Sequence, residues 1–163
     1  MKRVLLVLAT LAVAACATSS KTETAPAKEA APVAAAPAAE TESGKLATEI
    51  QTLQKDSVYF DFDKSAVKSE YSEVIQNQAK FIKAHTNDIV TVEGNCDERG
   101  SREYNLALGS RRAKAVAKSL EIAGVPAKQI KEVSFGKEKP RLSCHEEKCW
   151  KENRRADFVH KLD

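Results

Sequence analysis

The sequence lacks the residue patterns that most enzymes need. It has three histidines among its 163 residues, His85, His145 and His160, and they are scattered along the chain. No Ser–His–Asp or Cys–His arrangement, nucleophile elbow or glycine-rich phosphate loop accompanies them. We therefore predict no catalytic residue, no metal and no cofactor, and we interpret the chain as a binding protein rather than an enzyme.

A strong net charge of either sign is also missing. The formal net charge is +3 at pH 7, and it falls to +1 if Lys2 and Arg3 are removed with a signal peptide. A nearly neutral protein lacks the basic footprint of a nucleic-acid-binding protein. We predict no nucleic-acid partner, and we interpret the basic residues between Lys137 and Arg155 as a solvated rim or a partner surface.

The apolar segment near the N-terminus is too short to span a bilayer by itself. Lys2 and Arg3 precede the apolar run Val4–Val13, which is followed by Ala14-Ala15-Cys16. A basic flank, a short apolar stretch and small residues before the cut are typical of a secretory signal peptide, expected at residues 1–15. An ordinary signal peptide with an incidental cysteine is the alternative.

The residues around Cys16 also resemble a bacterial lipobox. In that interpretation Cys16 carries acyl chains, which anchor the protein because each buried CH₂ adds about 0.8 kcal/mol. Ala17 follows instead of Asp, which by resemblance to bacterial lipoproteins implies the outer membrane, with the rest of the chain facing the periplasm. Residues 16–44 are rich in Ala, Pro, Thr and Glu, so they predict a disordered linker behind the lipidated N-terminus.

Residues 45–163 suffice for one domain with its own core. Apolar periodicity predicts an α/β two-layer sandwich, with a βαβαββ-type mixed sheet covered by two helices on one face. The expected strands are 58–63, 89–93, 132–135 and 156–162, and the expected helices are about 71–87 and 101–123.

The loop between the second strand and the second helix holds Asp97. At about 100° per residue, Asn105, Leu108 and Arg112 share one stripe of that helix, expected nearly opposite the core stripe that includes Leu120. A carboxylate and a guanidinium with an apolar residue between them suit a zwitterion, since one accepts an ammonium and the other forks onto a carboxylate. A loop-capping aspartate and an exposed arginine are the alternative.

Several ordered motifs resemble the outer-membrane-protein-A-like (OmpA-like) domain family. They run over residues 58–64, 93–100, 104–113, 134–140 and 153–156, so the resemblance covers roughly residues 45–163. Ordered motifs at consistent spacing are more specific than one short pattern. The resemblance implies non-covalent binding of peptidoglycan through the diaminopimelate residue of its stem peptide.

Carried over position by position, the resemblance implies a ligand site around two opposite charges. Asp97 would accept the ligand ammonium, and Arg112 would hold its carboxylate. The other residues implied at this site are Phe62, Asp63, Arg99, Asn105 and Leu108.

The resemblance also implies a partner, a TolB-like periplasmic protein on an overlapping surface. Two other functions stay open at this stage. One is a cell-wall hydrolase, which needs a catalytic carboxylate pair or a metal site. The other is an accessory wall-binding subunit of another envelope complex, which needs a membrane-spanning part.

The remaining cysteines form a pair and a single residue. Cys144 and Cys149 lie five positions apart, and in an exported protein such a pair predicts a disulfide. Half a zinc site, completed by His160, is the alternative, although structural zinc sites need four ligands. The usual form of this loop in the family lacks both cysteines. Cys96 is left single beside Asp97, and we expect it to be partly buried and inert.

Overall fold

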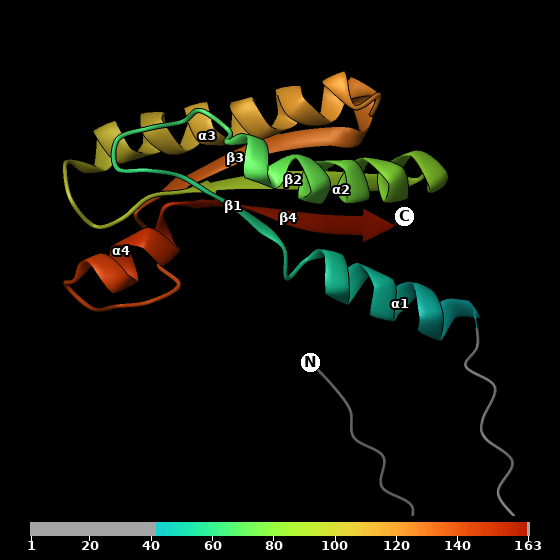
Figure 1. The fold of residues 1–163 in the computed structure, drawn as a ribbon, viewed down its shortest axis with the longest axis horizontal. Coiled ribbons are helices and arrows are strands. Elements are labelled where there is room, and N and C mark those ends of the chain that lie inside the picture. The colour runs from blue at the N-terminus through green and yellow to red at the C-terminus, as the bar shows by residue number, and fades with distance from the viewer. Residues whose placement is uncertain (1–41, 163) are drawn as a thin grey trace, which may run out of the picture. The chain divides into compact units, whose positions relative to one another are not determined.

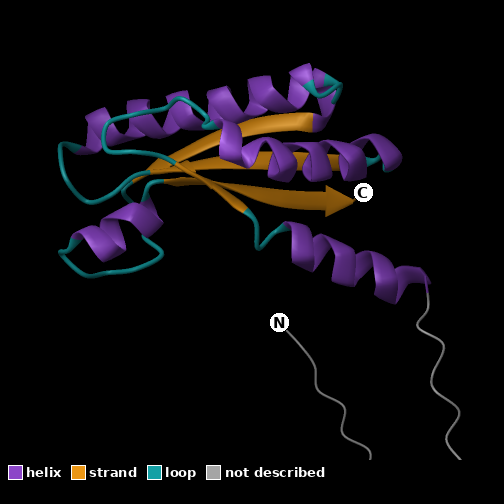
Figure 2. Cartoon of the chain, viewed as in Figure 1, coloured by secondary structure: helices purple, strands orange, loops and turns teal. Residues whose placement is uncertain are grey.

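A computed structural model describes residues 42–162, which form one four-stranded sheet and four α-helices (Figures 1 and 2). The helices are α1 (Glu42–Leu53), α2 (Ser72–Ala84), α3 (Arg102–Ile122) and α4 (Glu147–Asn153). The strands are β1 (Ser57–Tyr59), β2 (Asp88–Asn95), β3 (Ile130–Gly136) and β4 (Arg155–Leu162). Short 3-10 turns at Ser69–Tyr71 and Ala127–Gln129 precede α2 and β3.

The sheet is mixed, with the strand order β1-β4-β2-β3. Strands β2 and β3 are parallel and are joined by α3 as a βαβ unit, whereas β4 runs antiparallel to both β1 and β2. Helices α2 and α3 lie over the same face of the sheet (Figure 1). The predicted α/β two-layer class is confirmed.

The core lies between these two layers. Along β2, Val90 and Val92 are buried, while Ile89 and Thr91 between them are only half-buried, so one face of the strand points into the core. The other large buried side chains of the core come from both layers and include Val58, Phe60, Phe158, Ile75, Ile82, Val116 and Leu120. Burial of each such side chain stabilises the fold by roughly 1.5–3 kcal/mol.

Two glycines allow α3 to lie directly on the end of β2. A Cβ atom on Gly94 would come within 1.9 Å of the Gly109 carbonyl oxygen. A Cβ on Gly109 would come within 2.4 Å of the Ser134 Oγ atom. Any larger residue must push the helix off the sheet, so this contact fixes the first turns of α3 over the loop that follows β2.

The first strand is shorter than predicted. Alternating residues predicted a strand over 58–63, but β1 ends at Tyr59. Asp63 has a φ of 56°, in the left-handed region, which an extended strand cannot contain. The chain therefore turns here, and Phe62 is 58% exposed instead of lying on the strand's buried face.

Helix α3 buries one continuous stripe. Asn105, Leu108 and Arg112 are buried on the same face as Val116 and Leu120, since all are linked by spacings of three and four residues. The prediction that the first three lie opposite the core was wrong. Because the N-terminal turns of α3 cover the loops at the end of the sheet, polar residues occupy that end of the stripe.

Two helices were not predicted. Helix α4 lies between β3 and β4, where a loop was expected, so the order from β1 onward is βαβαβαβ rather than βαβαββ. Helix α1 begins at Glu42, ahead of the expected domain start at residue 45, and ends at the buried Leu53. The Gln78 side chain donates to the Leu53 carbonyl oxygen at 2.7 Å, which fastens the end of α1 to α2.

Candidate functional site

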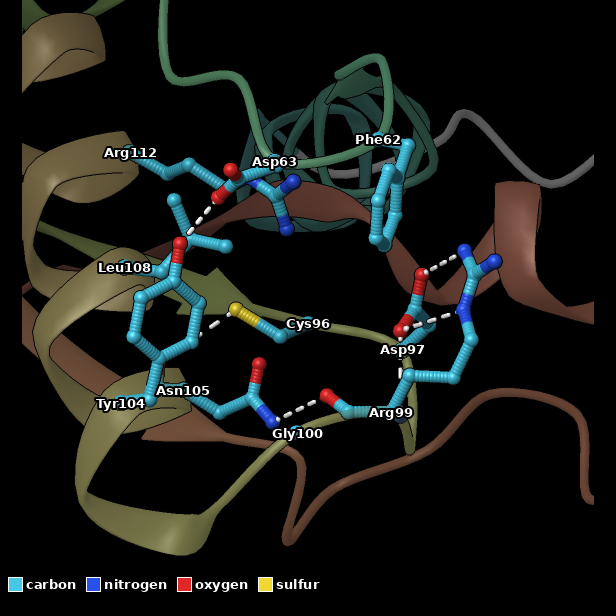
Figure 3. Close-up of a pocket in the computed structure, with 10 residues that line it drawn as sticks. All are labelled: Phe62, Asp63, Cys96, Asp97, Arg99, Gly100, Tyr104, Asn105, Leu108 and Arg112. Carbon is cyan, nitrogen blue, oxygen red and sulfur yellow. Dashed lines mark hydrogen bonds and ion pairs between the residues drawn. The ribbon is translucent and has the colours of Figure 1, made fainter.

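A cavity of about 130 Å³ opens where β2 ends and α3 begins (Figure 3). Its walls come from the turn after β1, the loop between β2 and α3, and the first turns of α3. The lining residues are Phe62, Asp63, Cys96, Asp97, Arg99, Gly100, Tyr104, Asn105, Leu108 and Arg112. Every residue predicted for the ligand site is in this lining, and the ligand assigned to them stays a prediction.

Asp97 is a buried carboxylate, 4% exposed and held by two arginines. Its Oδ1 accepts from the Arg99 backbone N–H at 3.1 Å and from Arg99 Nε at 3.3 Å. Its Oδ2 accepts from Arg99 Nη2 at 2.6 Å and from Arg154 Nη1 at 3.4 Å. Burial alone raises the pKa of Asp97, but these hydrogen bonds outweigh it, and the net pKa lies below its usual value. Asp97 is therefore an anion at neutral pH.

Arg112 faces the cavity from α3 and is 0% exposed. Its Nε donates to the Lys64 carbonyl oxygen at 2.9 Å, and its Nη1 donates to that of Asn95 at 2.8 Å. Its Nη2 donates to the Asp61 carbonyl oxygen at 3.2 Å. Burial lowers the pKa of Arg112. The guanidinium thus joins the turn after β1 to the end of β2, and each Nη still carries a second hydrogen.

Other side chains lie between and around Asp97 and Arg112. Leu108 is buried and reaches the cavity from α3, whereas Tyr104 is 45% exposed at its rim. The Tyr104 hydroxyl donates to the Asp63 carboxylate (Figure 3), and this bond raises the pKa of Tyr104. Asn105 donates through Nδ2 to the Arg99 carbonyl oxygen at 2.7 Å, which fixes the loop. The cavity therefore combines charged groups, an apolar wall and a polar rim.

Two residues beside the site were missed by the sequence analysis. Arg154 follows α4, is 6% exposed, and reaches both Asp97 and the Glu147 carboxylate. The ring of Trp150 in α4 lies 4.0 Å from the Arg99 guanidinium carbon. Arg154 lies in a family motif, which signals its importance but not its partner. Trp150 had no such signal, because its helix was interpreted as a loop.

Comparison with known proteins decides the family. The sequence pattern of the OmpA family matches residues 59–154. The chain belongs to the OmpA family. This OmpA-family chain is 46% identical over 104 residues to the peptidoglycan-associated lipoprotein of Agrobacterium fabrum, across 64% of this chain and 59% of that protein. The matched part thus spans less than two thirds of the Agrobacterium protein.

Two further relatives agree. The peptidoglycan-associated lipoprotein of Pasteurella multocida is 45% identical over 113 residues, which cover 68% of this chain and 75% of that protein. A crystal structure of the peptidoglycan-associated lipoprotein from Burkholderia pseudomallei is 48% identical and superposes with a TM-score of 0.63. That superposition covers 64% of this chain and 89% of the other. The OmpA-like architecture predicted from the sequence is confirmed.

The cysteines of the OmpA-family domain take two forms. Cys144 and Cys149 form a disulfide, as predicted, with their Cα atoms 5.7 Å apart. The zinc alternative is wrong, because these sulfurs are bonded to each other and His160 is hydrogen-bonded inside the core. Cys96 is a free and buried thiol that lines the cavity, and burial raises its pKa. A raised pKa leaves little thiolate, consistent with the low reactivity expected of it.

The segments expected to export and anchor the OmpA-family chain lie outside the described residues. These are the signal peptide at 1–15, the lipidated Cys16 and linker residues up to 41. Among residues 42–162, no helix has the length and apolar character needed to cross a membrane. In the same part of the chain, no group of three or more His, Cys, Asp or Glu side chains is placed to hold a metal ion.

Proposed function

We propose that this chain is an outer-membrane-anchored lipoprotein that binds peptidoglycan non-covalently and tethers the outer membrane to the cell wall. The relatives named peptidoglycan-associated lipoprotein support the wall association. The ligand is the diaminopimelate residue of the stem peptide, whose free end carries an ammonium and a carboxylate on one carbon. Its recognition requires binding and no catalysis.

The observation that carries this proposal is the presence of opposite charges around one cavity. Figure 3 shows Asp97 and Arg112 on different sides of the hollow. The ligand ammonium would bond to Asp97 and its carboxylate to the second hydrogens of Arg112, while Leu108 would contact the methylene chain. Charge-assisted hydrogen bonds of this kind are about twice as strong as neutral ones.

Binding at Asp97 requires an exchange of partners. A carboxylate has about four lone-pair sites, and Asp97 already accepts four hydrogen bonds. The two longest, 3.3 Å from Arg99 Nε and 3.4 Å from Arg154 Nη1, are the contacts that an ammonium would replace. Arg99 keeps its backbone bond at 3.1 Å and its Nη2 bond at 2.6 Å in this exchange, so it stays on the carboxylate.

The other predicted residues shape the entrance in this proposal. Asn105 holds the loop through the Arg99 carbonyl oxygen, as described above. Phe62 and Asp63 stand at the turn after β1, where main-chain and side-chain contacts with the peptide are open to them. Their exposure suits a ligand that remains part of a large polymer.

The rest of the chain supplies the anchor in the proposal. A signal peptide at residues 1–15 is removed, Cys16 carries acyl chains in the outer membrane, and residues 16–44 span to the wall-binding domain at 45–163. A TolB-like periplasmic protein would bind an overlapping surface. The chain would then be part of a Tol–Pal system that serves envelope integrity and cell division.

Co-sedimentation with purified sacculi tests the ligand assignment. The full-length protein should sediment with diaminopimelate-containing walls and stay in solution with lysine-type walls. Asp97→Asn keeps the side-chain shape but removes the charge, so we expect about a tenfold loss of affinity. Equal sedimentation of Asp97→Asn and wild type would overturn the assignment.

The matched control is Asp61→Asn, the same replacement at a carboxylate near the cavity. The Asp61 side chain is 65% exposed and pairs with Lys68 at 2.8 Å, so its loss should leave sedimentation unchanged. Release of soluble wall fragments by the wild-type protein would indicate a hydrolase and would also contradict the proposal.

A further inference from the structure

The Arg99 side chain lies between two aromatic rings. Its guanidinium carbon is 4.2 Å from the centre of the Phe62 ring and 4.0 Å from that of Trp150. Cation–π contacts of this length hold a guanidinium in one orientation. Here the fixed orientation is the one in which Arg99 donates to both oxygens of Asp97 (Figure 3).

The preceding residue, Glu98, is bound by the same segment. Its Oε1 accepts from the Trp150 indole N–H at 2.9 Å, and the His145 Nδ1 lies 2.7 Å from both carboxylate oxygens. The hydrogen bond from His145, followed by that from Trp150, lowers the pKa of Glu98. Two consecutive residues of the cavity loop are thus attached to residues 145–150.

The disulfide lies next to both residues of this segment that contact Glu98. His145 follows Cys144 directly, and Trp150 follows Cys149 directly. Cys149 is 4% exposed, so the second half of the bridge is set into the domain. A covalent link between the two cysteines keeps the histidine and the tryptophan close together, and both face the same glutamate.

A second route leads from α4 to the same carboxylate. Glu147, in the first turn of α4, accepts from Arg154 Nη2 at 2.5 Å, and Arg154 Nη1 reaches Asp97 at 3.4 Å. The disulfide-bearing segment therefore acts on Asp97 through two arginines. Each of these contacts involves a residue outside the cavity lining, since neither Trp150 nor Glu147 lines the cavity.

We propose that Trp150, held by the Cys144–Cys149 disulfide, is a positioning residue for the ligand site, because it orients Arg99 on the Asp97 carboxylate. This inference rests on the proposed function for its effect on wall binding. Its effect on the unliganded carboxylate is independent of any ligand. The two can therefore be measured separately.

The experiment compares Trp150→Leu with Trp150→Phe in the full-length protein. Leucine keeps apolar volume but has no ring face, whereas phenylalanine restores the ring without the N–H group. The pKa of Asp97 is followed by carboxyl ¹³C NMR, and binding is measured with a diaminopimelate-containing muropeptide. Leu142→Ala is the matched control, since Leu142 is half-exposed in the neighbouring loop and its backbone bonds to Asn153 are kept.

Trp150→Leu should raise the pKa of Asp97 toward its usual value and weaken binding about three- to tenfold. Trp150→Phe should restore most of both properties, and Leu142→Ala should change neither. The double variant Cys144→Ser/Cys149→Ser should shift both in the direction of Trp150→Leu, and it carries the test if that variant does not fold. A purely structural role for Trp150 would lower the melting temperature without moving the Asp97 pKa.

Wild-type pKa and affinity in both Trp150→Leu and the double cysteine variant would overturn the inference. If wild type fails to bind the muropeptide while the Asp97 pKa still depends on Trp150, the proposed function fails and the positioning role stands. If wild type binds and the pKa does not depend on Trp150, the reverse holds.

Discussion

Strand β2 has a buried carboxylate at each of its ends, and the two ends use it differently. Asp88 begins the strand and is 0% exposed, whereas Asp97 follows its end and is 4% exposed. Each is paired with a nitrogen-containing side chain, Asp88 with the His160 imidazole at 2.7 Å and Asp97 with the Arg99 guanidinium at 2.6 Å. A buried, paired carboxylate is therefore not by itself the mark of a binding site.

The surroundings of the two carboxylates differ. At the Asp88 end, His160 also bonds through Nε2 to Gln78 Oε1 at 2.8 Å, and Gln78 Nε2 donates to the Leu53 carbonyl oxygen. The side chains of that end bond mainly to one another in an internal network, although Asp88 Oδ1 has no hydrogen-bond partner among the described residues. At the Asp97 end, the charges face a cavity of about 130 Å³.

The difference shows what separates a ligand site from a structural network. Burial strengthens hydrogen bonds in both places. Of the two ends, the cavity end has open volume beside its charged groups. The Arg112 Nη atoms there also carry hydrogens that the internal bonds do not use. Substitutions at the two ends should therefore separate stability from binding.

The largest expected effect is that of Arg112→Met, which should lower both the stability of the fold and the affinity for the wall. The variant leaves the buried carbonyl oxygen of Asn95 and the part-buried ones of Asp61 and Lys64 without their charged donor. We expect the free energy of unfolding to fall by about 3–5 kcal/mol and wall binding to be lost. Urea denaturation and co-sedimentation with sacculi measure the two effects. Binding retained by the folded fraction would show that Arg112 is structural only.

Asp88→Asn should weaken only the internal network at the Asp88 end of β2. The amide keeps an acceptor for His160 but loses the negative charge, so we expect a loss of about 2 kcal/mol in the free energy of unfolding. Wall binding per folded molecule should stay at the wild-type level, because the Asp97 cavity is at the other end of β2. A loss of affinity comparable to that of Arg112→Met would contradict the separation of the two ends.

The elements that could be predicted from the sequence are those with local signals. Helix α2 and strand β4 follow from apolar periodicity. The start of α3 follows from Ser101, whose Oγ accepts the Tyr104 N–H at 3.1 Å as an N-cap. The membership of Asp97 and Arg112 in one cavity was implied by the family resemblance, whereas helix geometry alone placed Arg112 on the wrong face of α3.

The features that escaped prediction depend on contacts between distant segments. The left-handed turn at Asp63 lies in a sequence that alternates like a strand, and its carboxylate is bound by Tyr104 from α3. The role of Trp150 depends on a ring contact with Arg99, 51 residues earlier in the chain. Periodicity and capping rules describe neighbours in sequence, so they contain no information on such pairs.

A third prediction concerns acid sensitivity at the cavity end. The pKa of Asp97 is lowered in the folded state, so its ionised form stabilises the fold above the unfolded pKa of about 4. That stabilisation is lost as pH falls through the folded pKa. We expect Asp97→Asn to be less stable than wild type by about 1–2 kcal/mol at pH 7 and the difference to shrink in acid.

Urea denaturation at a series of pH values measures this difference. Asp61→Asn is the control, because the pKa of Asp61 is also lowered, chiefly by its bond with Lys68, but its side chain is 65% exposed. Solvent screening makes such a pair weak, so the control should follow the wild-type curve closely. Parallel curves for wild type and Asp97→Asn would show that the Arg99 contacts do not stabilise the fold.

The smallest expected effect is at the helix cap, beside the cavity but outside its charge pair. Ser101→Ala removes the acceptor for the Tyr104 N–H and should lower the free energy of unfolding by about 1 kcal/mol. Ser101→Thr keeps a capping hydroxyl and should restore most of the loss. Affinity for sacculi should change less than about twofold, because the bonds of Asp97 and Arg112 do not pass through the cap. A loss of affinity clearly greater than twofold would mean that the cavity depends on the first turn of α3 as a whole.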